Sequence, residues 1–377
     1  MTCLITFGKV NKHIIFPIIG GILKFIFKYL TSISTIITHN HGTVLCFCSS
    51  LGMSLSFFLF LIYKTKIKSL SPKNRNNNNI KSALLIELEY NDQLEIIKYH
   101  KYLHIFITAI LICLLNIASN VYIPKVRVNF WTFDIVFISL FSYLIFRIKI
   151  YKHHYICIII FIVAGIIFDS YLGVYSLSNN KDMNHIKFLI LRFLGEIIFS
   201  LIIVINKYIM EKKFCSPYEL CFYQGFIGLF LTTIYLLIFP KNFTNYWENI
   251  KSKEVFLFSA FVIIEFLYNI IILITINYYT AFHILICIII SEFQPFFEDS
   301  GNFGWTFSIA IIIYTFVFFV LLIFIEVFEL NFCGLQVNTK RNIAERAEKE
   351  KKLNLLEAQR NDSEFDEINN EEEMQNN

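Results

Sequence analysis

Apolar residues are gathered into ten long stretches that short polar segments separate. The first five cover 13–38, 43–63, 102–123, 129–148 and 154–175, and the second five cover 186–210, 218–239, 255–276, 280–297 and 305–328. A helix needs about 20 mostly apolar residues to cross a bilayer. The runs are continuous rather than alternating, which disfavours a transmembrane β-barrel. The pattern predicts an all-α integral membrane protein with about ten transmembrane helices.

The composition agrees with a membrane protein. Hydrophobic residues make up 56% of the chain and charged residues only 16%, which is outside the range of ordinary soluble domains. The first stretch has no small-residue cleavage site after it, so we expect a retained helix and not a signal peptide. The cysteines inside the stretches behave as small hydrophobes, and no CxxC motif is present.

The soluble parts differ in charge and divide the chain. The predicted regions are helices one and two (1–63), a basic cytosolic loop (64–101), helices three to five (102–185), helices six to ten (186–330) and a charged, partly disordered tail (331–377). Within the loop, 81–94 is a candidate short helix. In the tail, Glu345 with Lys349 and Glu348 with Lys352 have the i,i+4 spacing of a solvated helix, and a partner-binding coiled coil is the alternative.

The distribution of basic residues predicts the orientation. Lys and Arg are more frequent in the loops after helices two, four and six, and short loops of this kind stay in the cytosol. Both termini are then cytosolic. Asn242 begins a glycosylation sequon on the opposite side of this arrangement, which is compatible with it.

The spacing of the stretches indicates an internal repeat. Helices three to five and helices eight to ten start at positions offset by roughly 150 residues. Each half has an odd number of crossings, so the second half would enter the membrane upside down. Two inverted five-helix halves with a site between them are typical of secondary transporters.

Several segments resemble those of a known family. The stretches are NKYIMEKK at 206–213, SPYEL at 216–220, YQGFIG at 223–228, the 138–165 hairpin with Arg147, Lys149 and His154, and the 275–292 segment. They are similar to passages of the drug/metabolite transporter superfamily (EamA-like), closest to nucleotide-sugar transporters among the eukaryotic solute carriers. The resemblance covers most of the membrane body and none of the tail. It implies a ten-helix transporter of the endomembrane system (Golgi, ER or vacuole) rather than the plasma membrane.

Proline and glycine have specific structural roles in the segment that begins at Ser216. Pro217 suits the first turn of a helix, where its missing N–H has no partner, and Glu219 complements the helix dipole. Gly225 and Gly228 would let a neighbouring helix approach closely. We expect these positions to serve packing.

Polar residues inside the stretches are the candidates for substrate binding, because a central charge costs about 2.5–3.5 kcal/mol and should face a cavity or a partner. They are Glu265, Asn269, Glu196, Arg192, Lys24, Lys28, Asp134, Glu292, Asn116 and Asn120. Asp134 and Glu292 have corresponding positions in the two halves.

The candidates allow more than one interpretation. Arg192 and Glu196 are one turn apart, so they line the cavity or form an ion pair that only orients helix six. Glu265 has no basic residue within one turn, which favours a role as a proton-titrated site or as a contact to a polar substrate.

The charge of the solute is open. A nucleotide sugar would need Lys24, Lys28 and Arg192 for its phosphates, whereas the more numerous carboxylates suit a proton-linked carrier of cationic or neutral metabolites. No nucleotide-binding loop is present, so a gradient and not ATP would drive transport.

Other classes of function remain as alternatives. A membrane-bound iron enzyme could use the HxxxH of His100 and His104 with the adjacent His153 and His154, but such enzymes need several His boxes on one face. A receptor or scaffold acting through the loop and tail is the third. We expect a protein that is not an enzyme, with no cofactor or metal and no nucleic acid. Expected partners are membrane lipid, a small solute, a second copy in a homodimer and a cytosolic partner of the tail.

Overall fold

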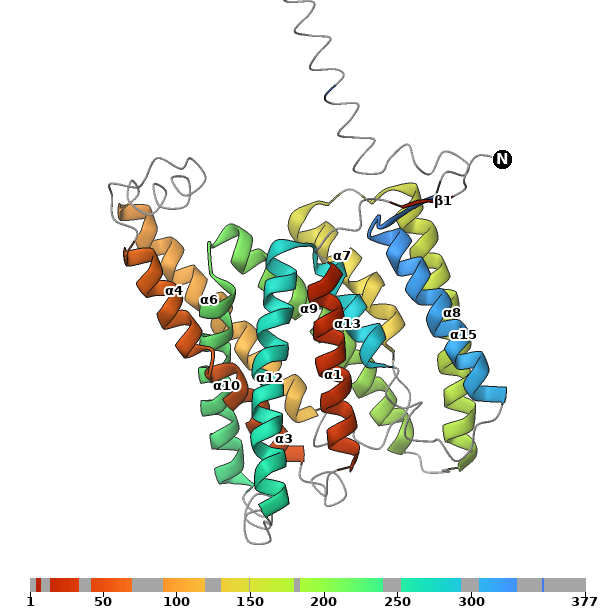
Figure 1. Ribbon diagram of the computed structural model, residues 1–377, viewed down its shortest axis with the longest axis horizontal. Coiled ribbons are helices and arrows are strands. Elements are labelled where there is room, and N and C mark those ends of the chain that lie inside the picture. The colour runs from red at the N-terminus through yellow and green to blue at the C-terminus, as the bar shows by residue number, and fades with distance from the viewer. Residues whose placement is uncertain are drawn as a thin grey trace, which may run out of the picture.

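The computed structural model describes residues 5–7, 14–33, 42–69, 91–118, 130–148, 150–179, 184–239, 252–292, 305–330 and 348. In these ranges the chain is almost entirely helical, and most helices run along one common direction (Figure 1). Five helical segments are long and apolar enough to cross a membrane, namely Thr43–Thr65, His100–Ile117, Leu189–Lys212, Pro217–Ile238 and Val255–Tyr278. Shorter apolar helices accompany them. The chain is a multi-pass membrane protein, as the hydrophobic pattern predicts.

A described helix lies within each of the apolar stretches. The helices are α1 (Ile15–Ile33), α3 (Gly42–Ser54), α4 (Phe57–Ser69), α6 (Asn91–Ile117), α7 (Asp134–Phe146), α8 (Lys152–Asn179), α9 (Asn184–Lys212), α10 (Pro217–Ile238), α12 (Ser252–Tyr278), α13 (Ile284–Ser291) and α15 (Trp305–Phe324). Single 3-10 turns, η4 (Trp131–Phe133) and η5 (Ala281–His283), precede α7 and α13. The strand β1 (Ile5–Phe7) pairs antiparallel with β2 (Phe328–Leu330).

The second predicted helix is in fact two helices, because the chain turns at 55–56 between α3 and α4. Serine hydroxyls compete with the helical backbone here. Ser54 Oγ donates to the Leu51 carbonyl and Ser56 Oγ to the Met53 carbonyl, each at 2.7 Å. Such local bonds offer the backbone an alternative to the helix. The predicted span over 43–63 is confirmed, because Thr43–Thr65 is long and apolar enough to cross a membrane, but this turn divides it into two helices.

The ends of the predicted loop, 64–101, are also more helical than expected. α4 continues to Ser69, and α6 begins at Asn91 rather than at Tyr102. Positions 81–90 of the candidate loop helix, the sequon at Asn242 and the tail pairs other than Glu348 lie outside the described residues.

The start of α10 agrees with its prediction. Pro217 is the first helical residue, and Glu219 lies in the first turn. The Ser216 hydroxyl caps the helix by accepting from the Glu219 amide at 3.1 Å. Lys101 Nζ of α6 lies 2.8 Å from Glu219 Oε1, which joins the two helices at this end.

Helix α10 comes very close to the backbone of α3 at Gly225. A Cβ atom at this position would lie 2.3 Å from the Ser54 nitrogen and 2.5 Å from the Met53 carbonyl carbon, both of them backbone atoms. At Gly228 it would lie 3.1 Å from the Ser50 hydroxyl, which belongs to a side chain. Only the first contact excludes a larger residue outright, because no rotation can move a backbone atom away.

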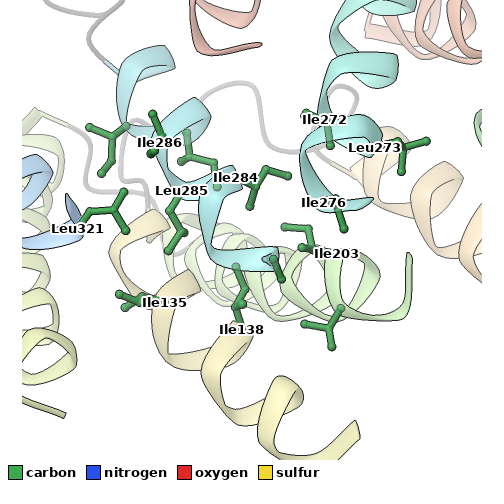
Figure 2. Packing of buried hydrophobic residues seen from close by; sticks show 14 of the residues in the cluster. Ile135, Ile138, Ile203, Ile272, Leu273, Ile276, Ile284, Leu285, Ile286 and Leu321 are labelled. Carbon is green, nitrogen blue, oxygen red and sulfur yellow. The ribbon is translucent and has the colours of Figure 1, made fainter. Parts of the chain in front are cut away.

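The core surrounds α13. Residues on all sides of this short helix are buried, including Ile284, Leu285 and Ile286. Figure 2 shows them packed with Ile135 and Ile138 of α7, Ile203 of α9, Ile276 of α12 and Leu321 of α15. A helix that is apolar all round has to be enclosed by other helices. α8 and α15 pack against each other at one end of the bundle, and α4 and α6 flank α10 at the other (Figure 1).

Candidate functional site

A cavity of about 430 Å³ lies inside the bundle. Its wall is formed by residues of α1, α3, α6, α7, α9, α10, α12 and α13, together with Glu292 at the end of α13. Its volume is in the range of small-molecule sites. Polar and charged side chains from helices far apart in sequence meet in this wall, so the cavity is the candidate functional site.

Three ion pairs line the cavity. Lys24 Nζ lies 3.3 Å from Glu265 Oε1, Lys28 Nζ lies 2.6 Å from Glu292 Oε1, and Arg192 Nε lies 3.0 Å from Glu196 Oε1. In each pair the base is more exposed than the acid, for example 27% against 5% for Lys24 and Glu265. The first two pairs join α1 to α12 and to the end of α13. The third stays within α9.

Glu265 is the most connected of the carboxylates. Besides Lys24, it accepts from the Ser49 hydroxyl at 3.2 Å and from Asn269 Nδ2 at 3.0 Å. Lys24 Nζ also lies over the Tyr268 ring, 4.6 Å from its centroid. Charge, hydrogen bonds and an aromatic face therefore meet at one point of the wall, an arrangement suited to holding a polar solute.

Glu265 has a cationic neighbour, although none lies within one turn of it on α12. Its partner Lys24 lies 241 positions earlier in the chain. Sequence spacing reveals only partners on the same helix, whereas this one is brought in by the packing of α1 on α12. The ion pair of Arg192 with Glu196, which is local, agrees with the i,i+4 interpretation.

Asp134 differs from the other carboxylates of the cavity. It is fully buried, and its Oδ1 accepts from the Ser200 hydroxyl at 3.1 Å. Its Oδ2 has no hydrogen-bond partner among the described residues. An unsatisfied buried carboxylate oxygen is costly, so it marks a place for a proton, a cation or a solute donor.

Nine of the ten predicted substrate residues line this cavity, and Asn120 lies outside the described residues. Asp134 opens α7 directly after η4, whereas Glu292 follows the last residue of α13. Helices four and nine would run in opposite directions in an inverted repeat, so these two ends would face the same side of the membrane. The predicted correspondence of the two positions stays a prediction.

A hydrogen-bonded group of neutral residues was missed among the candidates. Gln224 Nε2 of α10 donates to Thr108 Oγ1 of α6 and to Asn206 Oδ1 of α9, each at 2.8 Å. Gln224 and Asn206 also line the cavity. Both are polar residues within apolar stretches, so the criterion that selected Asn269 and Asn116 could have found them too.

Replacing Gln224 with leucine is expected to lower the free energy of unfolding by about 1–3 kcal/mol, because Thr108 and Asn206 lose a buried partner. The melting temperature of the purified protein in detergent measures this. Thr233→Val on the same helix is the matched control, since Thr233 is exposed and its hydroxyl bonds only the local Leu229 carbonyl. Equal melting temperatures for both variants would contradict the role of Gln224 in joining the helices.

The imidazole of His104, in the HxxxH pair of α6, already has partners within the protein. Nδ1 of His104 is hydrogen-bonded to the backbone carbonyl of His100. The His104 ring also packs on Tyr208, with ring centroids 5.9 Å apart. This arrangement gives no support to an iron site at these residues.

No family model matches the sequence, and no curated protein matches it.

Proposed function

We propose that the protein is a secondary transporter that carries a small polar solute across a membrane by alternating access. The observation that carries this proposal is the cavity, in which seven charged side chains from five helices and their ends converge within a membrane-spanning bundle. Ionisable groups placed within a bilayer are costly and are retained mainly along solute or proton pathways. Membership of the drug/metabolite transporter superfamily is part of the proposal.

Helix packing supports an inverted repeat of two five-helix halves. Under this arrangement α1 corresponds to α9, α3 to α10, and α6 to α12. α1 packs on α12 and α13, and α9 packs on α6 and α7, which are the equivalent pairs. α3 packs on α12 as α10 packs on α6. The 3-10 turns η4 and η5 begin equivalent helices, and the last helix of each half, α8 or α15, contributes no residue to the cavity.

The balance of charges favours a proton-linked carrier of cationic or neutral solutes. The wall holds three bases and four carboxylates, so one carboxylate is in excess when all are charged. Each base already has an acid partner, which leaves no unengaged base for the phosphates of a nucleotide sugar. Asp134, the carboxylate without a base, is the residue that we assign to the proton.

Uptake into proteoliposomes tests both proposals. A panel of nucleotide sugars, nucleoside monophosphates, amino acids and organic cations is offered with and without a pH gradient. We expect a cationic or neutral solute to be taken up saturably and faster along the gradient. Asp134→Asn should keep the fold but remove the acceleration, because the amide cannot exchange a proton.

Glu219→Gln provides the matched control, since Glu219 is an ion-paired carboxylate outside the cavity wall. It should leave the gradient response unchanged. Exchange of a nucleotide sugar for its monophosphate would instead support the exchanger, and a complete absence of uptake would contradict transport.

We extend the proposal to the cellular setting. The excess of basic residues in alternate loops supports cytosolic termini, and the family resemblance supports an endomembrane location. Membrane lipid and the solute are the partners that this function requires.

A further inference from the structure

A second cluster of polar side chains lies where α8 begins and α15 ends. His153, His154 and Glu326 each offer a ligand atom, and these atoms all lie within 4.8 Å of one another. His153 Nε2 lies 3.4 Å from Glu326 Oε1. None of the three residues lines the cavity of the proposed transport site. The cluster therefore needs an explanation of its own.

His153 is buried although its ring is polar. Its side chain is 5% exposed, and neither ring nitrogen has a hydrogen-bond partner among the described residues. Buried ring nitrogens are normally satisfied, so their lone pair or proton is directed at something else. The ring lies close to His154, with centroids 3.9 Å apart, and stacks on Tyr151. These neighbours hold the ring in place.

Glu326 is held by an unusual backbone. It follows the end of α15 with φ of 62°, in the left-handed region. The amide of Val327 bonds back to the Leu322 carbonyl at 2.8 Å, which completes a helix-ending motif that normally has glycine at this position. The left-handed conformation costs a residue with a side chain about 1–2 kcal/mol relative to the right-handed one. The carboxylate is thus directed at His153 despite a local preference for glycine.

We propose that His153, His154 and Glu326 bind a divalent transition metal ion of the zinc class. Two imidazoles and one carboxylate form a ligand set that zinc accepts, with water in the fourth position. Metal–ligand bonds of about 2.1 Å at tetrahedral angles separate ligand atoms by about 3.4 Å. The distance between His153 Nε2 and Glu326 Oε1 already has this value.

His154 is the ligand that must change its partner. Its Nδ1 accepts from the Tyr151 amide at 3.2 Å, so this lone pair is engaged. Binding through Nδ1 replaces that bond, and binding through Nε2 requires the other tautomer. Its ring also packs edge-on against Phe324 of α15, with centroids 4.8 Å apart, which keeps it beside the other two ligands.

The site would join the last helices of the two proposed halves. α8 supplies both histidines, and the residue that follows α15 supplies the carboxylate. These helices already pack together along their length. An ion there would stabilise this pair without touching the cavity. The proposal is independent of the transport function and stands if transport is disproved.

Binding of Co²⁺ and Zn²⁺ to the full chain tests the site. The protein is purified in detergent without a polyhistidine tag, stripped with a chelator and titrated with each metal. We expect one equivalent to bind, with the visible absorption of a four-coordinate Co²⁺ ion that Zn²⁺ then displaces. The melting temperature should rise with bound metal, because a ligand of the folded state stabilises it.

Two variants locate the ion. His153→Ala removes a ligand. Glu326→Gly removes the carboxylate while placing the residue that the backbone prefers, so misfolding cannot explain a loss of binding. Each should weaken binding by more than about tenfold, the loss that even an outer-shell partner causes. His104→Ala, a histidine on α6, is the matched control and should bind like the unaltered chain.

Failure of the unaltered protein to bind a stoichiometric ion would overturn the proposal. Binding that Glu326→Gly leaves unchanged would overturn it too, and would reduce the contact between His153 and Glu326 to an ion pair.

Discussion

Glu265→Gln is expected to abolish solute uptake and to destabilise the bundle. The substitution leaves the Lys24 ammonium facing a neutral amide, 3.3 Å from where the carboxylate oxygen lay. Breaking a buried pair costs about 3–5 kcal/mol, and because Lys24 stays 27% exposed we expect a smaller loss, about 1–3 kcal/mol. The uptake rate should fall further than the loss of folded protein explains, because Glu265 also holds Ser49 and Asn269 in place in the cavity wall.

A double variant separates the structural role of the pair from its transport role. Lys24→Met with Glu265→Gln removes both charges, which is often neutral for stability. We expect the melting temperature to recover and uptake to remain absent. The pair Lys101→Met with Glu219→Gln, outside the cavity, should keep uptake. If the Lys24 and Glu265 double variant transports normally, these residues only hold α1 against α12.

Gly225→Ala is expected to have the largest effect on folding. The added methyl group would overlap the backbone at Met53 and Ser54, so α10 and α3 would have to separate. Overpacking of a core costs typically about 1–3 kcal/mol, and a clash with backbone lies at or above the upper end of this range. The yield of monodisperse protein and its melting temperature measure the loss.

Gly228→Ala on the same helix is the control. Its methyl group meets the Ser50 hydroxyl at 3.1 Å, a contact that a small rotation relieves. We expect a loss below about 1 kcal/mol, because little has to move. Equal losses of stability from both substitutions would contradict this prediction. They would mean that the backbone contact at Gly225 is no more restrictive than the side-chain contact at Gly228.

Much of the helical framework can be predicted from the hydrophobic pattern. Each apolar stretch contains a described helix, because a segment in lipid must satisfy its backbone bonds internally. The turn between α3 and α4 could not be predicted in this way. It depends on the hydroxyls of Ser54 and Ser56 and on α10, whose Cys221 thiol also lies 3.7 Å from the Met53 carbonyl.

The residues of the candidate site could also be predicted, but their contacts could not. Intramembrane polarity was enough to select Lys24, Glu265 and Asp134, which line one cavity. The ion pairs between helices could not be predicted from the sequence. Lys28 and Glu292, for example, are 264 positions apart and meet only when α1 packs on α13. Glu326 lies near the end of the last apolar stretch, 305–328, and only the packing of α15 on α8 brings it close to His153.

The three ion pairs have a consequence for how the empty carrier would return across the membrane. In the proposed carrier, three acids neutralise the three bases and the fourth, Asp134, holds the proton, so the empty protonated cavity has no net charge for a solute to screen. The empty form can then reorient, because the loaded form has little electrostatic advantage over it. Such a carrier completes a return stroke without countersubstrate. It would fill a compartment against an empty opposite side, where an obligatory exchanger would stall.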